Sequence, residues 1–218
     1  MTDIKDCHQH KGCDHHHCDD QRRKRILMAI LAFVLGFGLV IFLVWVILQP
    51  HAPRFILQDA TVYAFNLSEP NSLNVNMQVT LSSSNPNERI GIFYDRLDIY
   101  TTYRNQEITL PTSLPCSYQG HKEITVWSPY LLGNAVPVSP LLCDVLGQDM
   151  STGMVLMNIK VDGAVKWKVG TWISGKYHIN VNCPAYISWG DHSKGVVPVG
   201  PPIKFQLVQH CTVGVSAS

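Results

Sequence analysis

The chain has 218 residues, of which 46% are hydrophobic and 15% are charged, and its formal net charge at pH 7 is +1. Residues 1–25 hold six of the 17 Lys and Arg and five of the 16 Asp and Glu, so residues 26–218 carry eleven of each sign. A region without net charge has no electrostatic footprint for nucleic acid, and we expect no nucleic-acid partner.

Cysteine and histidine are concentrated near the N-terminus, at Cys7, His8, His10, Cys13, His15, His16, His17 and Cys18. Thiolate and imidazole are ligands that zinc and copper prefer, so weak metal binding is one interpretation. The spacing matches no structural zinc module, and we assign no cofactor. We predict instead that residues 1–25 form a disordered cytosolic tail, in which Cys18 is a candidate for S-palmitoylation.

A run of 23 residues, Ile26–Leu48, contains no charged side chain and directly follows four basic residues, Arg22 to Arg25. As a helix it would be roughly 35 Å long, enough to cross a hydrocarbon core of about 30 Å. The run is longer than the apolar part of a signal peptide, so the sequence predicts an uncleaved transmembrane helix over 26–48. The preceding basic residues place the N-terminus in the cytosol and the rest of the chain outside.

Two small residues in this run, Ala32 and Gly36, have the small-xxx-small spacing that lets membrane helices pack closely. A homo-oligomer through the helix is therefore kept as an alternative to a single anchor. After the helix, residues 49–58 contain Pro50 and Pro53 and are expected to be a short, stiff spacer.

Alternating polarity predicts that residues 59–213 fold as an antiparallel β-sandwich, followed by a tail at 214–218. The strongest alternation is Leu73–Leu81, and Asn85-Pro86-Asn87 suits the turn that ends it. The other strands expected are Thr61–Phe65, Arg89–Tyr94, Leu97–Tyr103, Glu123–Trp127, Met154–Val161, Val165–Val169, Lys176–Cys183 and Ile203–Val208. Pro140–Met150 has helical spacing and predicts one short helix with Gly147 near its end.

Polar residues of the exported region give few chemical signals. Asp95 and Asp98 fall between two predicted strands and are interpreted as solvated turn residues. Asn66-Leu67-Ser68 is a sequon for N-glycosylation. No nucleophile elbow, phosphate-binding glycine loop or His-Glu-x-x-His site occurs in the sequence, so we do not expect an enzyme.

The order of several segments resembles a plant family, the proteins similar to non-race-specific disease resistance and harpin-induced proteins. These segments are the basic tail and single anchor, Val75–Leu81 with Asn85-Pro86-Asn87, Gly91–Asp95, Trp167–Trp172, Gly175–Cys183 and Cys211. The resemblance implies an outer domain of the late-embryogenesis-abundant type-two class with an immunoglobulin- or fibronectin-III-like sandwich. It also implies a plasma-membrane address, with the endoplasmic reticulum as the alternative, and a role in defence or stress responses.

Within this family frame, four cysteines lie on the exported side, where disulfides persist. Cys183 and Cys211 lie at or near the ends of predicted strands, and we expect them to pair, while Cys116 and Cys143 pair with each other or stay free. Tyr94 is expected to pack its ring and to bond through its hydroxyl group. Trp167 and Trp172 are interpreted as core or rim residues in preference to a ligand groove.

The leading hypothesis is a non-catalytic, membrane-anchored interaction protein of plant defence or stress signalling, with protein partners on both sides of the membrane. The alternative is a lipid-binding or membrane-tethering sandwich. In that alternative Phe55, Ile56 and Leu57, which directly follow the spacer's prolines, hold acyl chains in a groove near the membrane.

Overall fold

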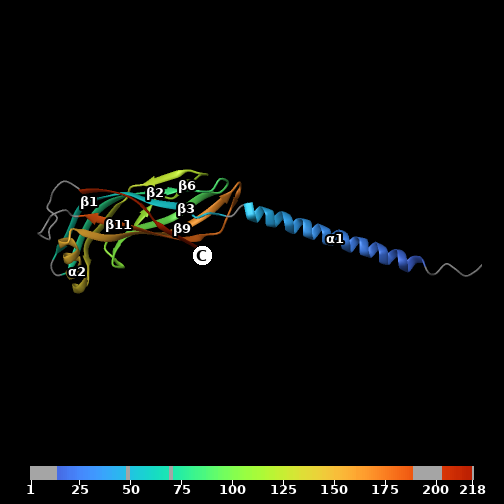
Figure 1. The fold of residues 1–218 in the computed structure, drawn as a ribbon, viewed down its shortest axis with the longest axis horizontal. Coiled ribbons are helices and arrows are strands. Elements are labelled where there is room, and N and C mark those ends of the chain that lie inside the picture. Colours follow the sequence, from blue (N-terminus) through green and yellow to red (C-terminus); the bar gives the residue numbers. More distant parts are fainter. Residues whose placement is uncertain (1–13, 48–49, 69–70, 189–202, 218) are drawn as a thin grey trace, which may run out of the picture. The chain divides into compact units, whose positions relative to one another are not determined.

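The computed structural model of the chain describes residues 14–47, 50–68, 71–188 and 203–217 (Figure 1). The chain divides into two compact units, Met1–Gln49 and Pro50–Ser218. Among the described residues, the first unit holds one helix and the second holds a further helix and all the strands.

The first unit is the helix α1, Asp14–Ile47, and its segment Arg22–Leu43 is long and apolar enough to cross a membrane. Apolar side chains are exposed along that segment, as expected of a helix that faces lipid. The prediction of a disordered tail over 1–25 is wrong for residues 14–25, which continue the helix. Gln, Arg and Lys favour helix, and extending a helix that already exists adds one hydrogen bond per residue.

One sheet of the second unit, sheet A, is built around two long strands. β1 (Arg54–Ser68) pairs with β2 (Ser72–Ser84) along its whole length, and β12 (Ile203–His210) covers its other edge. The free edge of β2 takes β7 (Ile124–Trp127) and β8 (Tyr130–Pro137) one after the other. All these pairings are antiparallel, as predicted.

The other sheet, sheet B, has the order β13-β11-β9-β3, again antiparallel. Its long strands are β3 (Gly91–Tyr103), β9 (Met154–Val169), β11 (Tyr177–Ser188) and β13 (Thr212–Ala217). Short strands extend it: β4 (Gln106–Glu107), β5 (Thr112–Leu114) and β6 (Ser117–Gln119) pair with β3, and β10 (Trp172–Ile173) pairs with β9.

The two sheets enclose one hydrophobic core. Along β2 every second side chain is buried from Leu73 to Leu81, which confirms the predicted alternation. Leu73, Met77, Val79 and Leu81 are 0% exposed, and Ile92, Ile99, Val161 and Ile179 of sheet B are equally inaccessible. Burial of a whole face of each strand fixes the register, because a slip by one residue would turn that face to water.

Two predicted strand breaks are absent from the structure. Residues 154–161 and 165–169, expected as separate strands, form the single strand β9. Residues 91–94 and 97–103, also expected in separate strands, belong to β3, whose register shifts at Asp95 in a β-bulge. Asp95 and Asp98 therefore lie within a strand and not in a turn, which corrects that prediction. Gly163 permits the continuous pairing on β9, since a Cβ there would overlap the carbonyl oxygen of Arg96.

Both ends of the sandwich extend beyond the predicted limits. β1 begins at Arg54, inside the expected spacer 49–58, because Phe55 and Leu57 are apolar and fill the core. Residues 214–217, expected as part of a tail, belong to β13 and pair with β11. The backbone N–H and C=O groups on this edge of β11 would otherwise lack partners in the sheet, and pairing with β13 satisfies them.

The second helix, α2, spans Pro140–Ser151, in agreement with the predicted helix, although it continues four residues past Gly147. Ser139 caps it by accepting a hydrogen bond from the Leu142 amide at 3.3 Å. The amide of Val138 donates to the carbonyl oxygen of Asn71, just before β2, which places α2 at the end of the sandwich where β1 turns into β2 (Figure 1). We call this the distal end. We call the opposite end, where residues 50–53 lead into β1, the proximal end.

Candidate functional site

Two asparagines hold the chain where it reaches the proximal end. Asn87 donates from Nδ2 to the His51 carbonyl oxygen at 2.8 Å, and the His51 amide donates to Asn87 Oδ1 at 2.9 Å. Asn85 Oδ1 accepts from the backbone and side-chain amides of Asn87 at 3.0 and 2.9 Å. Asn85 Nδ2 donates to the carbonyl oxygens of Ile90 and Gly120, both at 2.8 Å. All four hydrogen-bonding positions of the Asn85 side chain are therefore occupied.

A second buried polar group lies next to these asparagines. The Tyr94 hydroxyl donates to Gln119 Oε1 at 2.8 Å and lies 2.7 Å from Ser83 Oγ. Gln119 Nε2 donates to the carbonyl oxygens of Ser83 and Glu123 at 2.7 and 3.1 Å. Burial raises the pKa of Tyr94 well above its usual value, so the phenol remains a neutral donor. Tyr94 therefore packs and bonds as predicted. We refer to Ser83, Asn85, Asn87, Tyr94 and Gln119 as the proximal network.

Aromatic rings fill the core beneath the proximal network. The Tyr94 ring meets Phe55 and Trp127 edge-on, with centroids 6.4 and 5.3 Å away. Phe55 is 1% exposed and Leu57 is 0% exposed. The predicted contact of these two residues with acyl chains is therefore wrong, because their side chains lie on the inner face of β1.

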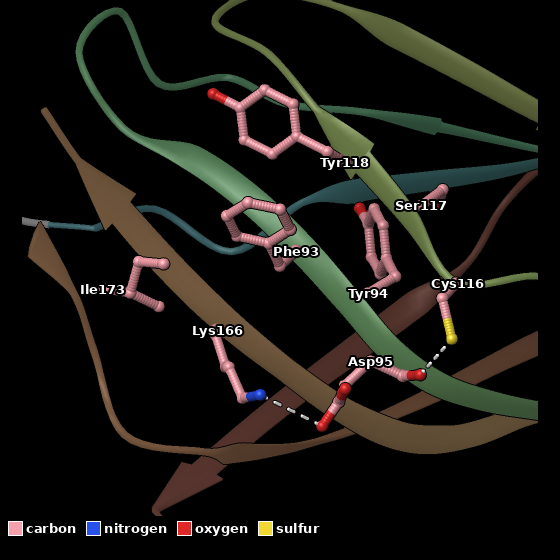
Figure 2. A pocket seen from close by; sticks show the side chains of 8 residues that line it. All are labelled: Phe93, Tyr94, Asp95, Cys116, Ser117, Tyr118, Lys166 and Ile173. Atoms are coloured by element: carbon pink, nitrogen blue, oxygen red, sulfur yellow. Dashed lines mark hydrogen bonds and ion pairs between the residues drawn. The ribbon is translucent and has the colours of Figure 1, made fainter. Parts of the chain in front are cut away.

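A hollow of about 430 Å³ lies on the face of sheet B that points away from the core (Figure 2). Its lining residues come from β3, β6, β9 and β10 and the turn before β6: Phe93, Tyr94, Asp95, Cys116, Ser117, Tyr118, Lys166 and Ile173. Gly91 makes room for one wall, since a Cβ at this position would overlap the Tyr118 ring. We call this feature the outer hollow.

Charge and aromatic surface meet in the outer hollow and directly beside it. Asp95 Oδ2 lies 3.2 Å from the ammonium groups of both Lys176 and Lys166, which lower the pKa of the Asp95 carboxyl group. Lys168 Nζ stands 5.6 Å from the ring centre of Phe93 and 5.1 Å from that of Tyr118. A carboxylate that two cations keep ionised is a poor general base at neutral pH. The arrangement suits binding of a mixed polar and apolar surface better than proton transfer.

The two tryptophans of interest have different environments. Trp167 is 5% exposed and meets the Tyr177 ring at 6.4 Å, so it is a core residue as predicted. Trp172 is 63% exposed at the first position of β10. This exposure corrects the prediction of core or rim packing. β10 follows the two-residue turn at the end of β9, and its first side chain faces solvent.

Cys183 and Cys211 form a disulfide, the pairing that the sequence suggests. Cys183 is buried in β11, and Cys211 stands between β12 and β13, where the chain passes from sheet A to sheet B. The link spans 28 residues and contributes roughly 3–4 kcal/mol in the chain-entropy model. The Cys211 amide also donates to the Phe55 carbonyl oxygen at 3.0 Å, so this corner is tied to the start of β1.

The remaining cysteines of the second unit are free, so of the two outcomes left open the structure shows the unpaired one. Cys116 is exposed and donates to the Asp95 carbonyl oxygen at 2.7 Å, near the proximal end of β3. Cys143 is buried in α2 at the distal end. The two thiols therefore lie at opposite ends of the sandwich.

The predicted modification and metal residues are only partly described. Asn66 is half-buried in β1 opposite Asn74, and its Oδ1 atom is inaccessible to water. An N-glycan would be joined to Nδ2, the other polar atom of this side chain. The tail candidates Cys7, His8, His10 and Cys13 lie outside the described residues. His15, His16, His17 and Cys18 belong to α1.

Within the described residues, the chain is an antiparallel β-sandwich preceded by one helix that is long and apolar enough to span a membrane. Residues 80–184 match the family described as late embryogenesis abundant protein. The chain is 50% identical to NDR1/HIN1-like protein 1 of Arabidopsis thaliana, over 94% of this chain and 100% of the relative. It is 51% identical to NDR1/HIN1-like protein 12 of the same plant, over 97% and 99%. Protein NDR1 of that plant is 23% identical over 81% of each chain. The chain therefore belongs to the NDR1/HIN1-like family of late-embryogenesis-abundant type-two proteins.

Several residues of the site gave no signal in the sequence. His51 takes part through its backbone, which carries no residue-specific pattern. Gln119 is 0% exposed, yet a glutamine between turn-forming residues is usually solvated. Beside the outer hollow, Lys168 contacts the Tyr118 ring, although the two residues are 50 positions apart and meet only because β6 and β9 both flank β3.

Proposed function

We propose that this chain is a single-pass plasma-membrane protein whose exported β-sandwich binds protein partners in plant defence or stress responses, without catalysis. The observation that carries the proposal is that, in a chain of the NDR1/HIN1-like family, one membrane-length helix precedes a packed sandwich. The family supports the defence or stress role, and the helix supports attachment to a membrane. The address, the orientation and the partners are our own inference.

The proposed orientation puts the N-terminus in the cytosol. Its support is the asymmetry of charge, since four basic residues precede the apolar segment and only Arg54 lies close after it. A pH-sensitive fluorescent protein fused to each terminus in plant cells tests it. We expect the N-terminal fusion to report a neutral cytosol and the C-terminal fusion to report the acidic wall space at the cell surface. A reversed pattern, or a signal confined to the endoplasmic reticulum, would contradict the proposal.

The outer hollow is the surface that we propose for a partner on the exported side. Tyr118 is 44% exposed, packs 4.6 Å from the Phe93 ring, and lies next to paired charges. Exposed aromatic side chains beside satisfied charges are typical of protein-binding surfaces, because they bury much apolar area with little loss of conformational entropy.

Proximity labelling with a ligase at the C-terminus of the full chain tests this surface. We compare the wild type with Tyr118→Ser and with Tyr186→Ser, which removes a tyrosine that is 53% exposed on β11. We expect Tyr118→Ser to lose at least one labelled protein that the Tyr186→Ser control retains. Identical protein sets from all three would contradict the role of the hollow. If the wild type labels no specific partner, and a second fusion with the ligase at the N-terminus labels none either, the function itself is contradicted.

The glycan at Asn66 remains part of the proposal and has a direct test. If the sandwich is exported, the full chain from plant cells should lose mass on treatment with a peptide N-glycosidase. The variant Ser68→Ala, which removes the sequon but keeps Asn66, should migrate like the treated wild type. An untreated wild type that already migrates with Ser68→Ala would show that the sequon is not used.

A further inference from the structure

The hairpin between β9 and β10 presents apolar side chains to solvent at its tip. Gly170, with φ of +57°, and Thr171 form the two-residue turn, and Trp172 pairs with Val169 just behind it. Trp172 is 63% exposed and Ile173 is 48% exposed. Ile173 also stands at the rim of the outer hollow (Figure 2). An indole held in water at the end of a hairpin leaves a large apolar surface without a partner.

The hairpin is rigid at its base, so its tip has a defined position on the sandwich. The amide of Ser174 donates to the Trp167 carbonyl oxygen at 2.9 Å, and the Trp167 amide donates to Ser174 Oγ at 2.9 Å. Trp167 itself is a core residue. The exposed pair therefore projects from a segment that is fixed to the core on both sides.

The tip lies at the proximal end of the sandwich. Ile173 pairs with Lys168 of β9, and Lys168 pairs with Gly91, the first residue of β3. The loop just before Gly91 contains Asn87, whose side chain makes the reciprocal hydrogen bonds with His51. The hairpin and the point where the chain enters the second unit are thus connected through one strand and one loop.

The length of chain after α1 limits how far this end can be from a membrane that holds α1. The helix ends at Ile47, and His51 is already fixed to the sandwich. Four residues span at most about 14 Å in any conformation. The headgroup layer on one face of a bilayer is about 5–8 Å thick. The proximal end is therefore held within about two such thicknesses of the end of α1, close enough for an exposed side chain at this end to reach the layer.

We propose that Trp172 and Ile173 insert into the headgroup region of the bilayer that holds α1. An indole prefers this region because its ring is apolar while its N–H group can still bond to water or ester oxygen. Lys168, the neighbour of Ile173 across the hairpin, supplies a cation for lipid phosphate. The inference rests on the proposed membrane anchoring. The sandwich would then be attached at two points, the chain and the hairpin, and could not rotate freely above the membrane.

Quenching of tryptophan emission by brominated lipid tests the insertion in the full chain. The protein is reconstituted in nanodiscs of phosphatidylcholine with or without bromine on the acyl chains near the headgroup. The emission of Trp172 is obtained as the difference between the wild type and Trp172→Phe, since phenylalanine keeps an apolar ring without indole emission. We expect bromine to reduce this difference about two-fold or more. A difference that bromine leaves unchanged would overturn the proposal.

Two further variants localise the effect. In the Trp172→Phe background, Ile173→Trp should restore a quenched component, and it provides a second probe if the first variant is poorly folded. Leu141→Trp in the same background places an indole at the distal end, on a position that is 74% exposed, and it should not be quenched. Quenching of Leu141→Trp to the same extent would overturn attachment by the proximal end.

Failure of the anchoring itself has a separate signature. Trp45 lies in the apolar run of α1, so the Trp172→Phe protein should still lose part of its emission in brominated discs. If it does not, α1 is not in the bilayer and the proposed function is wrong, while the Trp172 difference is still read independently. Trp172 that is shielded from aqueous acrylamide but not quenched by bromine would indicate contact with a second copy of the chain, and would also overturn the proposal.

Discussion

Tyr94 and Asp95 are neighbours on β3, and the polar groups around them have different surroundings. The proximal network around Asn85 and Tyr94 is buried, and the side-chain groups of these two residues bond to protein atoms. Around Asp95, on the outer hollow, the paired lysines remain 30% and 61% exposed. Water can replace a partner in the second group but not in the first. Similar hydrogen bonds and ion pairs therefore contribute very differently to stability according to their burial.

The largest effect is expected for Asn85→Asp, which keeps the shape of the side chain and removes its two donors. The carboxylate oxygen that replaces Nδ2 would then face the carbonyl oxygens of both Ile90 and Gly120 in a buried site, while Oδ1 could still accept from Asn87. We expect a loss of roughly 3–5 kcal/mol in the free energy of unfolding. Urea unfolding of the full chain in detergent, followed by tryptophan emission, measures it.

The matched control for this variant is Asn134→Asp, on an exposed position of β8. It makes the same chemical change where water can solvate the new charge, so we expect a shift of less than about 0.5 kcal/mol. Equal effects at Asn85 and Asn134 would remove the contrast between buried and exposed groups.

The Cys183–Cys211 disulfide gives a reference value for the loss of unfolding free energy expected in the proximal network. Cys211→Ser opens the disulfide that closes 28 residues, and we expect it to lower the free energy of unfolding by roughly 3–4 kcal/mol. Reduction of the wild type with a thiol should give the same shift when both are measured by urea unfolding. A reduced wild type as stable as the oxidised one would show that strand pairing alone holds this corner.

Tyr94→Phe tests the hydroxyl within the proximal network. It leaves Ser83 Oγ and Gln119 Oε1 without this partner, and we expect a loss of about 1–3 kcal/mol near neutral pH. Because burial raises the pKa of Tyr94 in the fold, the unfolded chain ionises first, and stability should fall above about pH 10.

The alkaline fall should be shallower in Tyr94→Phe, although it should not vanish. Burial also raises the pKa of Tyr100 and Tyr103 to about 12 each, and both act in the same direction. Unfolding free energies measured at neutral and alkaline pH for the two proteins give the comparison. An unchanged alkaline slope would mean that Tyr94 ionises in the fold as readily as in the unfolded chain.

The smallest effect is expected for Asp95→Asn on the outer hollow. Lys176 and Lys166 lower the pKa of Asp95 in the fold, so its contribution is present above the unfolded value of about 3.9 and is lost as pH falls through the folded value. We therefore expect a slight loss of stability at neutral pH that disappears in acid. High salt should reduce the difference between the two proteins, and a difference as large as that of Asn85→Asp would reverse the comparison.

The sequence was sufficient for features that depend on local pattern. The alternation of Leu73–Leu81 predicted β2 because one face of a strand must be buried, and the helical spacing after Pro140 predicted α2. The apolar run predicted a membrane-length helix by its length alone. These signals lie within ten to twenty residues and need no knowledge of partners.

Features that depend on distant partners were not predictable in the same way. The bulge at Asp95 joins two expected strands because Gly163, far along the chain, lets the backbones approach. Asn85 and Asn87 suited a turn, but their bonds to Gly120 and His51 required the folded arrangement. Trp172 was expected to be packed because tryptophan usually is, and only the register of β9 with β10 shows that it projects past the core.

The position of β1 has a mechanical consequence. β1 follows directly on the segment tied by Asn87 and lies between β2 and β12, with antiparallel hydrogen bonds on both sides. Tension between residue 50 and the distal end of the sandwich would act along β1, perpendicular to those bonds. Many bonds would then bear the force in shear at once, whereas a strand at a sheet edge pulled sideways releases them one at a time. The sandwich is therefore built to resist a force applied along β1.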